Sequence, residues 1–119
     1  MENEKRMSEL SVKTLENIGK NVRFTRRSLL NITYASMQEN TGVSRDVLCR
    51  LEDLSNTSTN ENFRGSPGFD TLIKFCDGVG VTPAELFEKE FSSDPDIQKR
   101  ILEHCKTFAN QDKNTVVLK

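Results

Sequence analysis

Residues 41–53, TGVSRDVLCRLED, decide the fold that we expect for this chain. Gly42 predicts the end of one helix, because glycine adopts a left-handed backbone at little steric cost. Ser44 can cap a following helix, at about residues 45–54. Apolar residues at helical spacing would form the buried stripe of that helix: Val47, Leu48, Leu51 and Leu54. Its outer face then carries polar or small side chains: Arg45, Asp46, Cys49 and Arg50.

The sequence before this turn predicts two further helices. The first, at about residues 14–29, has an apolar stripe formed by Leu15, Ile18, Val22, Thr25 and Leu29. Basic residues lie mainly off that stripe: Lys20, Arg23, Arg26 and Arg27. Thr33 can cap the second helix, at about residues 34–41. The inner stripe of this second helix would be Tyr34, Met37 and Thr41.

The sequence after the turn predicts a polar loop at residues 55–66 and then three more helices. Pro67 favours the start of a helix that Gly80 ends, with a buried stripe of Phe69, Leu72, Ile73, Cys76 and Val79. Thr82 and Glu85 around Pro83 form a capping box that starts the next helix. A last helix, at about residues 95–110, has an apolar face formed by Ile97, Ile101, Cys105 and Phe108. That face packs either on the chain's own core or on a partner subunit.

These helices predict an all-α fold of about six helices, and the composition limits what the chain does. A chain of 119 residues suffices for one domain, and no apolar run reaches a membrane-spanning length. The charged start MENEKRMSEL is no secretory signal, so we expect a cytoplasmic protein. The widely spaced cysteines predict reduced thiols, no metal site and no cofactor. The single histidine, His104, lacks a nucleophile or carboxylate constellation, so we do not expect an enzyme.

The net charge of −1 conceals an uneven distribution. Residues 13–64 hold eight basic and six acidic side chains, and six of the eight are arginines. Residues 65–119 hold seven basic and nine acidic side chains. The flat guanidinium heads in the front half suit phosphates and guanine edges.

The order of short helices, with TGVSRDVLCRLED followed by PGFDTLIKFCDGVGVTPAELF, resembles the phage-repressor (Cro/XRE-type) helix-turn-helix domains over about residues 15–88. The resemblance implies a five-helix domain that binds duplex DNA sequence-specifically, usually as a homodimer. Here that domain would span residues 13–91, after a flexible leader at 1–12. Residues 92–119 would add one extra C-terminal helix and a tail, which could serve as a dimerisation element.

The resemblance also assigns roles on the helix at 45–54, which would enter the major groove. Arg45 and Arg50 can each donate two hydrogen bonds to a guanine edge. Asp46 either accepts from a cytosine amine, or only caps its helix or pairs with Arg50. Cys49 is a small group that allows close approach or touches a thymine methyl.

Phosphate contacts would surround these base contacts. The candidates are Arg23, Arg27, Thr33, Tyr34, Ser44, Asn56 and Arg64. Family members usually carry glutamine at the Tyr34 position, so an amide contact becomes a phenol contact. Glu52 matches a family acid that pairs with an arginine of the first helix. The partner is Arg26 if one extra residue precedes Thr33, and Arg27 if not.

The sequence also departs from the family pattern in three respects. Gln38 and Thr41 stand where family members usually carry a small alanine and a leucine, the loop at 55–66 is longer, and the overall charge is near neutral. Because the motif fits in order, spacing and turn chemistry, the leading hypothesis is a DNA-binding transcriptional regulator, a repressor. The alternative is a protein-interaction adaptor that keeps the fold without binding DNA.

Overall fold

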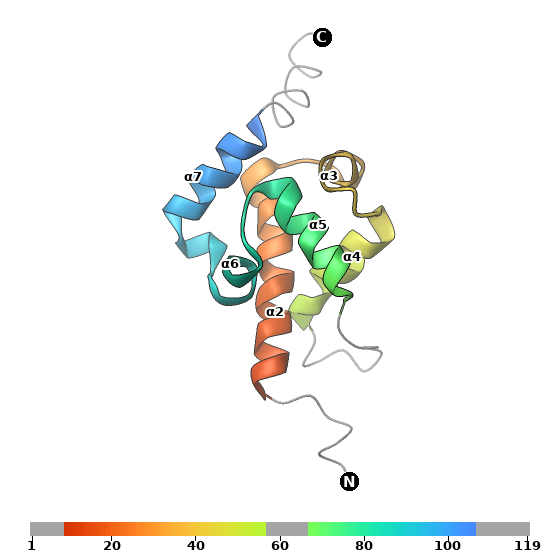
Figure 1. Cartoon of the computed structure of the whole chain (residues 1–119), viewed down its shortest axis with the longest axis vertical. Coiled ribbons are helices and arrows are strands. Elements are labelled where there is room, and N and C mark those ends of the chain that lie inside the picture. The colour runs from red at the N-terminus through yellow and green to blue at the C-terminus, as the bar shows by residue number, and fades with distance from the viewer. Residues whose placement is uncertain (1–8, 57–66, 107–119) are drawn as a thin grey trace.

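The computed structural model describes residues 9–56 and 67–106, and within them every regular element is a helix. The fold is therefore all-α, as predicted. Figure 1 shows α2 running through the centre of the molecule, with α7 and α6 on one side of it and α3 and α4 on the other. The elements are α2 (Glu9–Arg23), η1 (Phe24–Leu30), α3 (Tyr34–Thr41), α4 (Arg45–Asp53), η2 (Leu54–Asn56), α5 (Phe69–Val79), α6 (Pro83–Glu88), η3 (Phe91–Ser93) and α7 (Pro95–His104). None of the described helices is long and apolar enough to cross a membrane.

The first helix differs from its prediction at both ends. It begins at Glu9 rather than near residue 14, and its first turn is exposed, with Leu10 on the surface. Periodicity located only the buried part of the helix, which begins at Leu15. From Phe24 to Leu30 the chain continues as a π-helix, which ends where Asn31 adopts a left-handed backbone with φ of 53°. The leader expected at residues 1–12 is thus helical from Glu9 onward.

Helix α5 buries a different face from the one expected. It begins at Phe69, after the Gly68 cap, and not at Pro67. Phe69 is 68% exposed and Ile73 is 36% exposed, whereas Phe75, which the predicted stripe omitted, is fully buried. Successive residues of a helix turn by about 100°, so Ile73 lies well away from the face that Leu72 and Phe75 share. Phe69 lies in the first turn, beyond the end of the core.

Helix α6 is held by both local and distant contacts. The Thr82 backbone N–H donates to Glu85 Oε1 at 2.9 Å, and the Glu85 N–H donates to Thr82 Oγ1 at 3.1 Å, which confirms the predicted capping box. At its other end, buried Asn21 of α2 donates to the carbonyls of Leu86 at 3.0 Å and Lys89 at 2.8 Å. Asn21 therefore satisfies carbonyls that a helix C-terminus leaves without partners.

Helix α7 packs on the chain's own core. Asp94 Oδ1 accepts from the Ile97 N–H at 3.1 Å and caps the helix. Ile97, Ile101 and Cys105 are buried in the same apolar cluster as the other helices. The described part of this apolar face is thus covered without a second subunit. Phe108, expected on the same face, lies outside the described residues.

Candidate nucleic-acid interface

A tight turn joins α3 to α4, and local sequence signals build it. Thr33 caps α3 by accepting from the Ser36 N–H at 3.1 Å, and Ser44 caps α4 by accepting from the Val47 N–H at 3.4 Å. Between the two helices, Gly42 has φ of 80°, in the left-handed region that glycine enters most easily. These are the caps and the turn that the sequence predicts.

Gln38 and Thr41, which depart from the family pattern at this turn, both form hydrogen bonds. Gln38 Oε1 accepts from the backbone N–H of Arg45 at 3.1 Å, so a side chain of α3 satisfies a free donor at the start of α4. Thr41 is buried, donates from Oγ1 to the Met37 carbonyl at 2.8 Å and accepts from the Val43 N–H at 3.1 Å. Polar contacts thus fix the angle between the helices where the family pattern would use apolar packing.

Helix α4 has one buried and one exposed face. Leu48 and Leu51 are buried, Val47 is half-buried, and Leu54 continues the stripe from η2 because α4 ends at Asp53. The residues expected to contact bases lie on the opposite face. Arg45, Asp46 and Arg50 are exposed, and Cys49 is half-buried. Neither Arg45 nor Arg50 has an ion pair within the described part of the chain.

Glu52 anchors α4 from its inner side, with only 6% of its surface exposed. Arg26 donates from Nε to Glu52 Oε2 at 2.6 Å and from Nη2 to Oε1 at 3.2 Å. The Tyr34 hydroxyl donates to the same Oε1 at 2.9 Å, and the Arg26 guanidinium lies 3.9 Å from the centre of the Tyr34 ring. One carboxylate therefore joins the first helix, α3 and α4.

The pKa values of Tyr34 and Arg26 are both raised in this network. Burial, followed by the hydrogen bond to Glu52, raises the pKa of Tyr34 to about 12. The hydrogen bond to Glu52 likewise raises the pKa of Arg26. Both donors ordinarily keep their protons at neutral pH, and the raised pKa values extend the protonated range of each to higher pH.

The partner of Glu52 is Arg26 and not Arg27, and Arg26 lies within the π-helix. A π-helix closes its hydrogen bonds over one residue more than an α-helix does. The N–H groups of Asn31 and Ile32 both donate to the Arg26 carbonyl, which ends the widened segment. The widened segment thus lies just before Thr33, and Arg26 within it is directed at Glu52.

Tyr34 requires a correction. Its hydroxyl was expected to meet a phosphate, but it donates its only hydrogen to Glu52. Two cations also lie near its ring, with the Arg26 guanidinium 3.9 Å and the Arg45 guanidinium 5.9 Å from its centre. Tyr34 is thus a support for α4 and for Arg45.

The remaining phosphate candidates are spread over several elements. Thr33 and Ser44 are exposed at the N-termini of α3 and α4. Asn56 ends η2, and its side chain and the whole of Arg64 lie outside the described residues.

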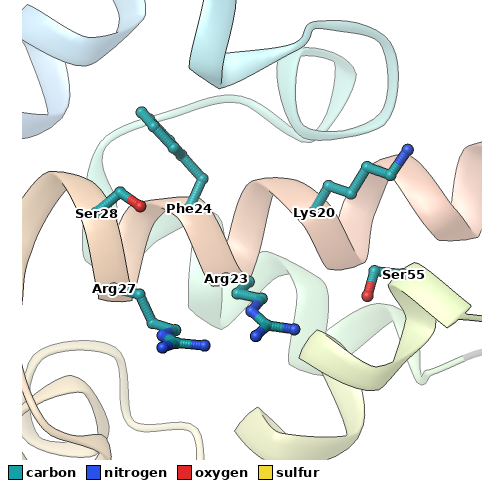
Figure 2. Close-up of a pocket in the computed structure, with 6 residues that line it drawn as sticks. All are labelled: Lys20, Arg23, Phe24, Arg27, Ser28 and Ser55. Carbon is teal, nitrogen blue, oxygen red and sulfur yellow. The ribbon is translucent and has the colours of Figure 1, made fainter.

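Arg23 and Arg27 line a hollow of about 540 Å³ together with residues that were not among the expected phosphate contacts: Lys20, Phe24, Ser28 and Ser55. In Figure 2 the two arginine heads extend on one side of the helix, and the Phe24 ring and the Lys20 amine extend on the other.

The described residues show no grouping of three or more His, Cys, Asp and Glu side chains that could hold a metal ion. The three cysteines are free thiols. Burial raises the pKa of Cys76 to about 11 and also raises the pKa of Cys105. Both thiols therefore stay protonated at neutral pH.

A scan against protein-family models and searches of curated proteins and solved structures found no match for this chain. The resemblance to the phage-repressor family therefore remains an expectation that rests on the residues themselves.

Proposed function

We propose that this chain is a sequence-specific DNA-binding transcriptional regulator, a cytoplasmic repressor, that reads the major groove of duplex DNA with α4. One observation carries the proposal. Arg45 and Arg50 stand on the exposed face of a helix whose other face is anchored by Leu48, Leu51 and Glu52. A groove-reading helix needs these two properties together, because its base contacts require a rigid support.

The proposed roles follow from side-chain chemistry. Arg45 and Arg50 donate to guanine O6 and N7, and each good pair is worth about 1–3 kcal/mol of discrimination. Asp46 accepts from a cytosine amine, and Cys49 lies against a base edge without bulk. Arg23, Arg27, Thr33 and Ser44 meet phosphates around the helix. In a homodimer, two copies of α4 would reach half-sites about 34 Å apart.

Selection from a random duplex library tests the proposal. We expect an enriched sequence whose binding weakens steeply as salt rises, because phosphate contacts release counterions. Arg45→Ala should relax the preference at one or two base pairs, whereas Arg23→Ala should weaken all sequences alike. Lys99→Ala, at an exposed position of α7, is the control and should leave both properties unchanged. Absence of any enriched sequence together with salt-insensitive binding would reject the proposal.

The second candidate function is a protein-interaction adaptor, and the exposed apolar residues of α5 favour it. Phe69 and Ile73 are four residues apart and both face solvent, which is a typical anchor spacing for protein contacts. A purified partner that binds in fixed stoichiometry, loses affinity with Ile73→Ala and ignores Arg45→Ala would support this alternative.

A further inference from the structure

The hollow across α2 and η1 is lined by three basic side chains. Lys20, Arg23 and Arg27 follow one another at spacings of three and four residues, and all three line the hollow. Figure 2 shows the two arginine heads on one side of the helix and the Lys20 amine on the other. None of the described residues that line the hollow is acidic. None of the three cations is ion-paired within the described ranges 9–56 and 67–106. The hollow is therefore suited to an anion of several negative charges.

The hollow also offers an aromatic wall and hydroxyl groups. Phe24 is half-buried and packs against the core, so its ring is held in place while one part of it lines the hollow. Ser28 and Ser55 add hydroxyls that both donate and accept hydrogen bonds. The volume of about 540 Å³ lies within the range of small-molecule sites. An anion with a flat ring would use every one of these features.

We propose that this hollow binds a nucleoside polyphosphate, a ligand separate from the duplex that α4 would read. Arg23 and Arg27 hold the phosphate chain as bidentate donors, and the Lys20 amine adds positive charge on the side of the Phe24 ring. The base lies across the helix against the Phe24 ring, which Figure 2 shows on the side opposite the arginine heads.

Phe24 distinguishes this ligand from a duplex. The bases of duplex DNA are stacked on one another, so they have no free face for an aromatic side chain, whereas an unpaired base does. A single strand would offer such a base too, but it needs a groove that follows several nucleotides, and this hollow has the size of one small molecule. The π-helical segment supports a binding role, because π-turns recur at functional sites and η1 contributes Phe24, Arg27 and Ser28.

The ligand would also act on the proposed DNA binding. Arg23 and Arg27 are candidates for phosphate contacts to the duplex, so a bound nucleotide would compete with DNA for them. This consequence rests on the proposed function, whereas nucleotide binding itself does not.

Calorimetric titration of the full chain with adenosine triphosphate, in the absence of DNA, tests the proposal. We expect saturable binding, with Arg23→Gln plus Arg27→Gln weakening it at least about tenfold, because charge-assisted hydrogen bonds are lost. The matched control is Lys89→Gln plus Lys99→Gln, which removes the same charge from exposed positions elsewhere. Circular dichroism and thermal unfolding verify that each variant is folded.

A second comparison tests the ring. Phe24→Leu keeps an apolar side chain and should weaken adenosine triphosphate about tenfold while leaving inorganic triphosphate unchanged. Absence of binding, equal losses in the arginine pair and the lysine pair, or equal affinity for triphosphate and adenosine triphosphate would each overturn the proposal. Tighter binding of an oligothymidine strand with the same dependence on Arg23 and Phe24 would overturn it in favour of single-stranded nucleic acid. Because no duplex is present, these results are independent of the outcome of the library selection.

Discussion

The carboxylate of Glu52 shows how single residues position the candidate interface. It is buried, it receives two hydrogen bonds from Arg26 and one from Tyr34, and it sits in the last turn of α4. A buried carboxylate is costly to leave alone, so the three residues are stable only as a set. The set is also the link between the first helix and the exposed arginines of α4.

Arg26 and its neighbour Arg27 provide a paired test of this network. Arg26→Met should lower the free energy of unfolding by about 3 kcal/mol, because Glu52 then stays buried with an incomplete set of donors. Arg27→Met removes the same charge from an exposed side chain and should change stability by less than about 0.5 kcal/mol. Urea unfolding followed by circular dichroism measures both. Equal effects of the two variants would show that Glu52 does not depend on Arg26.

Tyr34 is the only tyrosine and the chain has no tryptophan, so phenolate absorbance reports this residue alone. In the native protein it should ionise near a pKa of about 12. In the urea-unfolded chain it should ionise near the usual value of about 10. A native pKa above the unfolded one means that the network's contribution is complete below pH ~10 and is lost as pH rises towards ~12. Tyr34→Phe should remove this alkaline loss of stability, and an unshifted native titration would contradict the hydrogen bond to Glu52.

At the scale of elements, the turn between α3 and α4 depends on backbone conformation and not on space. A Cβ atom at Gly42 would meet nothing within 4 Å, and neither would one at Gly68. The two glycines differ in φ, which is 80° at Gly42 and −67° at Gly68. Substituting alanine adds the same Cβ atom at both positions, so a difference in stability between the two variants reports the cost of the left-handed backbone alone.

Gly42→Ala should destabilise the chain by about 1–2 kcal/mol, because a Cβ atom strains the left-handed conformation. Gly68→Ala should stay within about 0.5 kcal/mol, because its lower quality as a cap is offset by a less flexible unfolded chain. Thermal unfolding of both variants gives the comparison. A neutral Gly42→Ala variant would show that the turn can be made with another backbone geometry.

The elements that could be predicted from the sequence are those with signals inside a few residues. Thr33, Gly42, Ser44 and the Thr82 capping box all act within one helical turn, and the structure has each of them. Asn21 and Gln38 were missed as contact residues, because their partners lie on other helices. The π-helix Phe24–Leu30 was not predicted either, because its apolar spacing resembles that of an α-helix.

At the scale of the whole molecule, the buried apolar residues of the described ranges form one core, and α7 belongs to it. The boundary expected between residues 91 and 92 divides Phe91, which is buried, from Ile97 and Ile101, which lie in the same cluster. Arg100 also reaches α6, where it donates to Glu85 at 2.6 Å and lowers the pKa of that carboxyl. The described part of α7 therefore supports the domain that carries α4.

Neighbouring residues of α7 can establish whether this helix unfolds with the rest. Ile101 is fully buried and Leu102 is 43% exposed, although the two are adjacent in the chain. Ile101→Ala should lower the free energy of unfolding by about 2–5 kcal/mol, because it opens a cavity in the shared core. Leu102→Ala should cost less than about 1 kcal/mol. Circular dichroism and Tyr34 fluorescence should report one coincident transition for each variant, since Tyr34 lies on α3 and both helices pack on the same core. Two separate transitions, with Tyr34 unaffected by Ile101→Ala, would instead make α7 an independent element that is free to serve a second subunit.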